Sequence, residues 1–321
     1  MRTSRRRTSA ASAPESVAGP PPAKRWRTRA VGNVWITHPD RVVYPDVGVT
    51  KLMVAEYYAA VGERMLAFVA GRPLAIVRCP DGLAAQCFFQ KHVGRYAIPG
   101  IDVVQVDEST GRNPYAVANR IDALVGLAQW NALELHVWGA TAPEIERPDT
   151  LVLDLDPDPA LPWSALVEAA RETRAVLEAL DLESFVKTTG GKGLHVVVPL
   201  ERRSSWDEVK AFARGVAMRL VRGAPERFTA TMGEANRRGK IFVDYLRNAR
   251  GATAVAAYSL RARPGATASA PLSWRELSAS TPPSAFTVST VPKRIAQRTD
   301  PWKDYGASRQ RLSPKALQGL R

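Results

Sequence analysis

The chain has 321 residues, of which 45% are hydrophobic, so it can bury a large core in one large or two modest domains. Its formal net charge is +14 at pH 7, from 45 basic and 31 acidic residues. A positive surplus this large indicates that the protein binds polyanions, nucleic acid above all. The alternative, that the charge serves only solubility, is the weaker interpretation. No apolar run approaches the roughly 20 residues of a membrane span, so we expect no membrane partner.

The N-terminal segment is strongly basic. The first thirty residues hold eight Lys or Arg and one acid, Glu15, which gives them a charge of +7. Residues 1–32 lack hydrophobic periodicity, and we predict a disordered basic arm there. No apolar stretch follows the arginines, which excludes a secretory signal, although an organelle transit peptide has the same composition.

Cys79 and Cys87 are the only cysteines of the chain. Their spacing is not that of a metal site, and two cysteines cannot supply a framework of disulfides. We therefore expect a reducing, cytoplasmic location.

Hydrophobic patterns predict the elements of the first half. Thr50 is expected to cap a helix that runs to about Val69 and buries one apolar stripe. Residues 73–79 and 85–91 are expected to form paired strands, joined by a Pro-Asp-Gly turn at 80–82. We predict a helix over residues 113–132 and a strand over 133–139.

The second half alternates between the two kinds of element, which indicates a mixed α and β class with helices on the faces of sheets. Strands are predicted at residues 150–156, 184–188, 193–200, 240–246 and 252–262, and helices at 161–180 and 206–222. The last fifty residues predict only helix fragments and loops.

Two carboxylates close an apolar strand. Because side chains alternate between the two faces of a strand, Asp154 and Asp156 point to the same face, roughly 7 Å apart. Asp244 ends another apolar run. A solvated turn is the alternative, since Asp and Pro favour turns. A calcium loop is excluded, because its sixth position would be Pro159 and its twelfth Ala165. Oxygen ligands without His or Cys select Mg²⁺ or Mn²⁺, and two such ions suit displacement at phosphorus.

A glycine-rich turn, KTTGGKGLHVVVPL, joins two predicted strands at residues 187–200. Its glycines permit positive φ angles and close approach of the backbone. Thr189 and Lys192 then offer a hydroxyl and an ammonium to a phosphate. His195 alone would be a core histidine more often than not, but its neighbours favour contact with phosphate.

Basic and aromatic residues form further candidate sites. Lys51 falls in the first turn of a helix, where the dipole favours an anion, and Arg41 lies across a short loop; a solvated lysine is the alternative. Several basic residues flank Asp244, which suits a polyphosphate: Arg237, Arg238, Lys240, Arg247, Arg250, Arg261 and Arg263. Phe88 and Phe89 could form a platform on which bases stack, or they could belong to a core strand. We favour a core position for one of the two.

These segments, in this order, resemble the polymerase domain of bacterial DNA ligase D, in the archaeo-eukaryotic primase superfamily. The resemblance runs from about Val34 to Leu312 and rests on long motifs, among them ITHPDRVVYPDVGVTK, FFQKH, LELHVWG, LVLDLDPD, KTTGGKGLHVVVPL and GKIFVDYLRNARGATAVAAYSLRARPGA. It implies an α+β fold with a primase-like catalytic core, in which two β-rich lobes with flanking helices make one compact domain. That domain would span residues 33–312, followed by a tail at 313–321.

The resemblance also implies roles for individual residues. Asp154, Asp156 and Asp244 would hold two divalent ions, Mn²⁺ or Mg²⁺. Thr189 stands where the family often has serine, near the nucleotide sugar, and Phe88 matches an aromatic near a base. The other nucleotide contacts would be His136, Lys192, His195, Arg247, Arg261 and Arg263. Arg41 and Lys51 would capture the 5′-phosphate at a DNA gap or break.

The implied activity is transfer of a nucleotide to a primer 3′-hydroxyl at gaps and double-strand break ends, with ribonucleoside triphosphates and Mn²⁺ preferred. The implied partners are 5′-phosphorylated DNA, Ku and a separate DNA ligase, since no ligase or phosphoesterase motif is present. Two alternatives stay open. One is a primase that starts chains de novo, and the other is a non-catalytic module that binds 5′-phosphorylated ends and recruits a ligase.

Overall fold

Two six-stranded sheets dominate the computed structural model, which describes residues 27–94, 98–313, 316 and 320. The β10 sheet has the order β13-β14-β10-β12-β11-β16. Its strands are β10 (Thr150–Pro157), β11 (Phe185–Thr188), β12 (Leu194–Pro199), β13 (Phe228–Thr229), β14 (Ile241–Asp244) and β16 (Pro271–Leu272). All its neighbours pair antiparallel except β13 and β14.

The β9 sheet has the order β15-β9-β5-β8-β7, and β6 also pairs with β5. Its strands are β5 (Leu74–Arg78), β6 (Phe88–Gln90), β7 (Asp102–Glu108), β8 (Gly111–Val117), β9 (Ala132–Trp138) and β15 (Thr253–Val255). Two small hairpins precede it, formed by β1 (Thr28–Val31) with β2 (Val34–Thr37) and by β3 (Val42–Tyr44) with β4 (Val49–Thr50).

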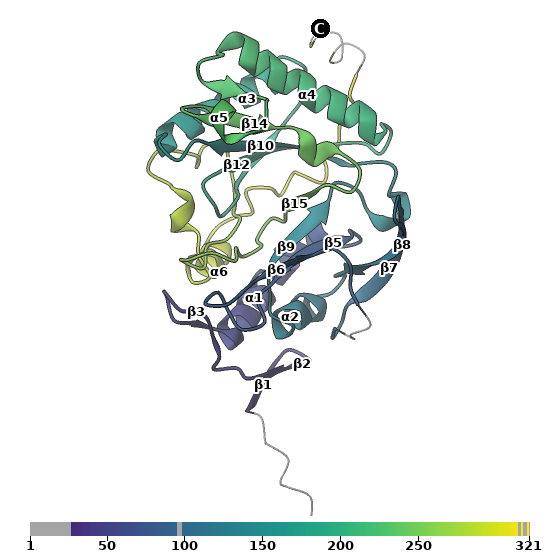
Figure 1. Ribbon diagram of the computed structural model, residues 1–321, viewed down its shortest axis with the longest axis vertical. Coiled ribbons are helices and arrows are strands. Elements are labelled where there is room, and N and C mark those ends of the chain that lie inside the picture. Colours follow the sequence, from purple (N-terminus) through teal and green to yellow (C-terminus); the bar gives the residue numbers. More distant parts are fainter. Residues whose placement is uncertain (1–26, 95–97, 314–315, 317–319, 321) are drawn as a thin grey trace, which may run out of the picture.

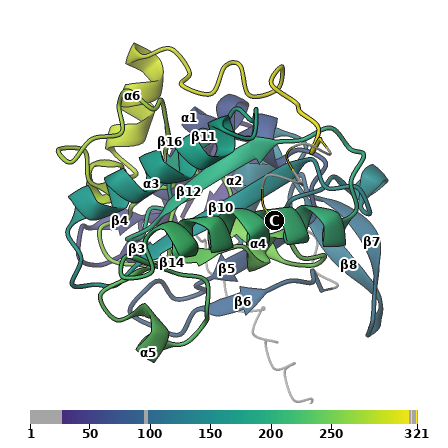
Figure 2. The same cartoon turned by 90° about the horizontal axis from the view of Figure 1, so that it is seen from above.

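Helices cover the outer faces of both sheets (Figure 1). Helices α3 (Trp163–Glu178) and α4 (Trp206–Gly223) lie across the β10 sheet, as the view from above also shows (Figure 2). Helices α1 (Lys51–Val69) and α2 (Ile121–Gln129) pack together beneath the β9 sheet. The short helices are α5 (Glu234–Arg237), α6 (Thr290–Gln297) and the 3₁₀ turns η1 (Ala142–Glu144), η2 (Leu246–Asn248) and η3 (Pro283–Ala285).

Local sequence explains the two best-capped helices. The Thr50 hydroxyl accepts from Met53 N at 3.3 Å, and α1 buries its predicted stripe from Val54 to Met65. Helix α4 begins with a capping box between Ser205 and Glu208, which satisfies two backbone donors of its first turn. The apolar faces of the helices and sheets join in one main core, so the predicted class of two β-rich lobes with flanking helices is confirmed.

Three sequence predictions of secondary structure are wrong. The helix predicted for residues 113–132 is confined to Ile121–Gln129, because residues up to Val117 pair with β7, a strand that was not predicted. The strand predicted for 252–262 stops at Val255, and Tyr258 adopts a φ of 67° that an extended strand does not allow. Most of the predicted arm lies outside the described residues, but Thr28–Val31 form β1, so order begins earlier than expected.

Cys79 and Cys87 form a disulfide, which the sequence analysis did not anticipate. The two residues lie at the loop end of the β5–β6 hairpin, next to the pair of Arg78 with Phe88, and their Cα atoms are 4.3 Å apart. No helix in the described part of the chain is long and apolar enough to cross a membrane. The predicted tail at 313–321 lies largely outside the described residues.

Candidate functional site

Asp154 occupies the centre of the β10 sheet, between Asp244 and His195. It is the direct cross-strand partner of Asp244 on β14 and of His195 on β12. Directly opposed residues place their side chains on the same face of a sheet, so the three groups form one row. Lys187 on β11 extends that row, since it pairs with His195. The predicted association of Asp154 with Asp244 is therefore present.

Basic side chains neutralise each of the three carboxylates. Arg247 Nε lies 3.3 Å from Asp154 Oδ2 and 3.2 Å from Asp244 Oδ2. Arg237 Nη1 donates to Asp156 Oδ2 at 2.8 Å, and Lys192 Nζ lies 3.3 Å from Asp156 Oδ1. Asp154 and Asp244, which we call the acidic row, and Asp156 beside them are thus neutralised by the chain's own cations.

Burial and neighbouring charge act in opposite directions on the carboxylates. Burial opposes ionisation of Asp154, but His195, Arg247 and Lys187 hold its pKa at about 2. Burial raises the pKa of Asp244 above its ordinary value, although Arg247 lowers it. Asp154 therefore stays ionised at any working pH.

The carboxylate oxygens of the three aspartates are the kind of ligand that a hard divalent ion prefers. Asp154 and Asp244 each approach a single cationic atom of Arg247, which shows that their oxygens can converge on one positive charge. Within the described ranges no three ligating side chains converge on one point. Arg247 contacts both Asp154 and Asp244, and Lys192 and Arg237 contact Asp156. An ion held by all three acids would require Arg237 and Lys192 to leave Asp156.

The glycine turn between β11 and β12 closes on itself. The Thr189 hydroxyl accepts from Gly191 N at 3.2 Å and Gly193 N at 3.3 Å, and Gly190 has a φ of 68°. Lys192 Nζ donates to Pro157 O at 2.8 Å, which carries it over the end of β10. The predicted positive φ is confirmed at Gly190, and the turn presents Lys192 beside Asp156.

The β9 sheet supplies the opposite wall. His136 on β9 and Glu134 two residues earlier share one face, with His136 Nε2 2.8 Å from Glu134 Oε2. Arg261 bridges to the other sheet, because its Nε lies 3.0 Å from Glu134 Oε1 and its Nη1 donates to Thr189 O at 2.7 Å. In this wall, the carboxylate of Glu134 therefore holds both the His136 ring and the Arg261 guanidinium.

The two walls enclose a cavity of about 240 Å³. Nine of the predicted site residues line it: His136, Asp154, Asp156, Thr189, Lys192, His195, Arg247, Arg261 and Arg263. Four of these are cationic and two are acidic, so the lining carries a surplus of positive charge that suits an anionic ligand. Asp244 borders the cavity through Arg247 but does not line it.

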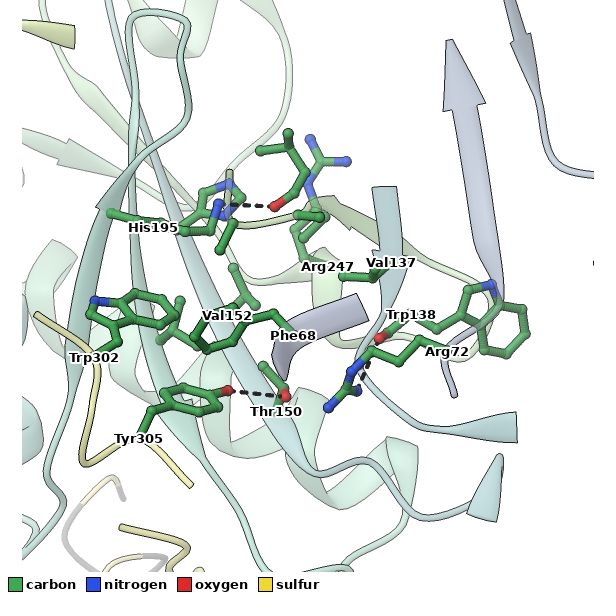
Figure 3. A pocket seen from close by; sticks show the side chains of 17 residues that line it. Phe68, Arg72, Val137, Trp138, Thr150, Val152, His195, Arg247, Trp302 and Tyr305 are labelled. Carbon is green, nitrogen blue, oxygen red and sulfur yellow. Dashed lines mark hydrogen bonds between the residues drawn. The ribbon is translucent and has the colours of Figure 1, made fainter. Parts of the chain in front are cut away.

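A smaller, mainly apolar cavity of about 50 Å³ adjoins the first, and Figure 3 shows the side chains that line it. The two cavities share His195 and Arg247, and the second is closed by the aromatic rings of Phe68, Trp302 and Tyr305. Lys187 stands at this boundary and donates to Val255 O at 2.9 Å and to Ser269 Oγ at 2.8 Å. Burial lowers its pKa to about 7.

His195 lies deep in the site. Its side chain is 3% exposed, and Nδ1 has no hydrogen-bond partner among the described residues. Burial and the nearby Lys187 lower its pKa to about 4, so the ring is neutral at pH 7.

Arg41 and Lys51 form a second basic site, away from the cavity. Lys51 is only 4% exposed, and its backbone N donates to Arg41 O at 2.8 Å. Arg41 Nη1 donates to Pro80 O at 2.7 Å, inside the loop that the disulfide closes. Burial, helped by Arg41, lowers the pKa of Lys51 to about 8. The alternative of a solvated lysine is thereby excluded.

Phe88 and Phe89 are both exposed, at 47% and 54%, so the expected core position for one of them is wrong. Strand β6 lies at the margin of its sheet and pairs only with β5, which leaves both rings without a covering layer. Phe89 meets His136 edge-on, with ring centroids 5.7 Å apart, whereas Phe88 does not line the cavity.

The sequence analysis missed three site residues. Glu134 and Lys187 lie inside apolar strands, and only the strand period of two, counted from His136 and from Thr189, could have placed them on the cavity side. Arg237 was noted among the bases near Asp244 but not assigned to the site.

Comparison with known proteins gives one consistent result. The family model "LigD, primase-polymerase domain" matches residues 50–302. The multifunctional non-homologous end joining protein LigD of Pseudomonas aeruginosa is 45% identical over 310 residues, which cover 93% of this chain and 37% of that protein. The bifunctional non-homologous end joining protein LigD of Bacillus subtilis is 32% identical over 267 residues, 83% of this chain and 43% of that protein.

A solved structure agrees. The polymerase domain from Mycobacterium tuberculosis ligase D in complex with DNA matches with a TM-score of 0.80 and 34% identity, over 86% of this chain and 99% of that one. The chain spans about two fifths of the length of the two relatives named above. It belongs to the LigD primase-polymerase domain family.

Proposed function

We propose that this chain is a DNA-repair nucleotidyltransferase, which adds nucleotides to a primer 3′-hydroxyl at gaps and double-strand break ends in non-homologous end joining. The observation that carries the proposal is the pairing of Asp154 with Asp244, with Asp156 beside it, at the edge of a cavity that four cationic side chains line. Family membership and the DNA-bound neighbour support it.

Asp154, Asp156 and Asp244 would hold two divalent ions, Mn²⁺ or Mg²⁺, whose charge, when they are bound, lowers the pKa of the attacking hydroxyl and offsets charge on the triphosphate. Lys192, Arg247, Arg261 and Arg263 would bind the triphosphate oxygens, and His195 would contact them as a neutral imidazole. These side chains orient the α-phosphorus toward the primer end, which is the main contribution a protein makes to phosphoryl transfer.

Arg41 and Lys51 would bind the 5′-phosphate on the far side of a gap. The charge of Arg41 helps to lower the pKa of Lys51, so the two cations are close enough to act on one anion. The exposed ring of Phe88 would stack on a base. Ku and a DNA ligase activity are the partners we propose for the steps before and after nucleotide addition.

The test is a nucleotide-addition assay on a 5′-phosphorylated gap, with Mn²⁺ or Mg²⁺ and with ribo- or deoxynucleoside triphosphates. We expect addition with Mn²⁺ and ribonucleotides to be fastest. Asp154→Asn should abolish addition yet keep DNA binding, whereas Asp107→Asn, whose carboxylate is exposed on β7, should change neither.

The same assay separates the alternatives. Synthesis on single-stranded template without a primer would favour a primase that starts chains de novo. Binding of phosphorylated ends by the wild-type chain without any addition would favour a silent module that recruits a ligase.

A further inference from the structure

Glu134 connects two side chains of the cavity through a single carboxylate. It lies on β9 and is 6% exposed. Its Oε2 is 2.8 Å from His136 Nε2, and its Oε1 accepts from Ala262 N at 2.8 Å and lies 3.0 Å from Arg261 Nε. Both oxygens are therefore occupied by cavity residues or by the backbone next to one.

The connection continues into the other sheet. Arg261 Nη1 donates to Thr189 O at 2.7 Å, in the glycine turn of the β10 sheet. Arg261 also packs on that turn, since a Cβ built on Gly190 would lie 2.7 Å from its Cγ. Glu134 thus fixes the guanidinium that spans the two walls of the cavity.

The carboxylate determines which nitrogen of His136 carries the proton. Burial opposes ionisation of Glu134, but His136 and Arg261 hold its pKa at about 2, so Glu134 is an acceptor only. Burial lowers the pKa of His136 although Glu134 raises it, so the ring is neutral at pH 7. The neutral ring therefore carries its hydrogen on Nε2, and Nδ1 is the acceptor.

We propose that Glu134 is a positioning residue for the nucleotide, which sets the tautomer of His136 and the direction of the Arg261 guanidinium before a triphosphate enters. This inference rests on the proposed function, in which both residues contact the nucleotide. Glu134 acts through these two residues and needs no contact with the nucleotide itself.

Glu134→Gln is the direct test, because glutamine keeps the shape but removes the charge beside Arg261 and turns a donor toward His136. Glu108→Gln is the matched control. Glu108 lies on β7 of the same sheet, and its Oε2 is 2.8 Å from His92 Nε2, but it lines neither cavity described above.

The readouts are KM for ATP and kcat in nucleotide addition with Mn²⁺, together with Kd for gapped DNA. Contacts that hold the nucleotide equally in the ground and transition states affect KM alone. We expect Glu134→Gln to raise KM about tenfold or more, with kcat and the DNA Kd within about twofold, and Glu108→Gln to change none of them. An unchanged KM, or a KM that rises only in step with the DNA Kd, would overturn the proposal.

A second measurement needs neither a variant of Glu134 nor catalysis. Nitrogen-15 NMR of the wild-type imidazoles, with His136 assigned by its loss in His136→Asn, should report the Nε2–H tautomer at pH 7. An Nδ1–H or a charged ring would overturn the role of Glu134. A wild-type chain with the expected tautomer but no nucleotide addition would instead contradict the proposed function, so the two failures are distinguishable.

Discussion

Arg247 Nε is shared by Asp154 and Asp244, at 3.3 and 3.2 Å from one oxygen of each. Its place in η2 is fixed by its neighbour Asn248, whose side chain accepts from Val152 N at 2.8 Å and donates to Val152 O at 2.7 Å. The buried amide of Asn248 thus takes the place of a strand partner of β10, and the preceding residue, Arg247, points at Asp154 and Asp244. Any cation that enters this site must compete with Arg247.

Arg247→Gln should therefore tighten binding of Mn²⁺ in the absence of nucleotide, by about tenfold or about 1.4 kcal/mol, because the internal cation no longer competes. Nucleotide KM should rise, since a contact to the triphosphate is lost. Isothermal titration with Mn²⁺ checks the first effect. Arg250→Gln is the control, because Arg250 pairs with Glu146 at 2.7 Å and not with the acidic row. Equal or weaker Mn²⁺ binding by Arg247→Gln would show that it does not compete.

Lys51 predicts a pH dependence of DNA binding. Its pKa is lowered to about 8, so it is charged below that pH and loses its proton as the pH rises through it. The affinity for a 5′-phosphorylated gap should fall by about tenfold between pH 7 and pH 9, while a gap that ends in a hydroxyl should lose much less. Lys51→Arg should remove the difference, since arginine stays charged.

Lys51→Ala should weaken binding of the phosphorylated gap more than that of the hydroxyl-ended gap. Fluorescence anisotropy at constant salt measures both. Equal weakening of the two would mean that Lys51 supplies only general attraction to DNA.

Gly190 tests how closely Arg261 packs on the glycine turn. Its φ is 68°, and a Cβ there would lie 2.7 Å from Arg261 Cγ and 2.8 Å from the carbonyl carbon of Ala268. Gly48 has a similar φ of 65°, and its Cβ would meet nothing within 4 Å. Gly48→Ala should therefore cost about 1 kcal/mol of unfolding free energy, from the backbone conformation alone.

Gly190→Ala should cost about 2 kcal/mol more than Gly48→Ala and should also raise nucleotide KM, because the added methyl pushes Arg261 aside. Urea unfolding and steady-state kinetics measure the two effects. Equal costs at the two glycines would mean that the turn relaxes freely around the new methyl.

Much of the site follows from local sequence. The strand period predicts that Asp154 and Asp156 share a face, and an apolar run that ends at Asp244 predicts a second strand with a carboxylate at its end. The observed register, in which Asp154 opposes both Asp244 and His195, requires knowing which strands pair. The pairing of these strands depends on contacts between segments that are far apart in the chain, and local sequence patterns do not specify such contacts.

The errors have the same origin. Residues 113–117 form β8 because β7 is available to pair with them, and Pro114 already disfavours helix at Asn113. Phe88 and Phe89 are exposed on β6, a short strand at the margin of its sheet, and hydrophobicity alone cannot reveal that position. Composition does not single out Glu134, because its ion pair with Arg261 joins residues far apart in the chain.

The disulfide between Cys79 and Cys87 closes the loop that holds Pro80, whose carbonyl accepts from Arg41 at 2.7 Å. A cross-link over so short a segment constrains the unfolded chain by about 2–3 kcal/mol on the loop-entropy model. Cys87→Ser should therefore lower the unfolding free energy by about that amount, and a dithiol reductant should do the same to the wild-type chain but not to Cys87→Ser. Urea unfolding with and without reductant measures both. Because Arg41 loses a fixed partner, Cys87→Ser should also weaken binding of the phosphorylated gap, and an unchanged affinity would show that Arg41 is positioned without the disulfide.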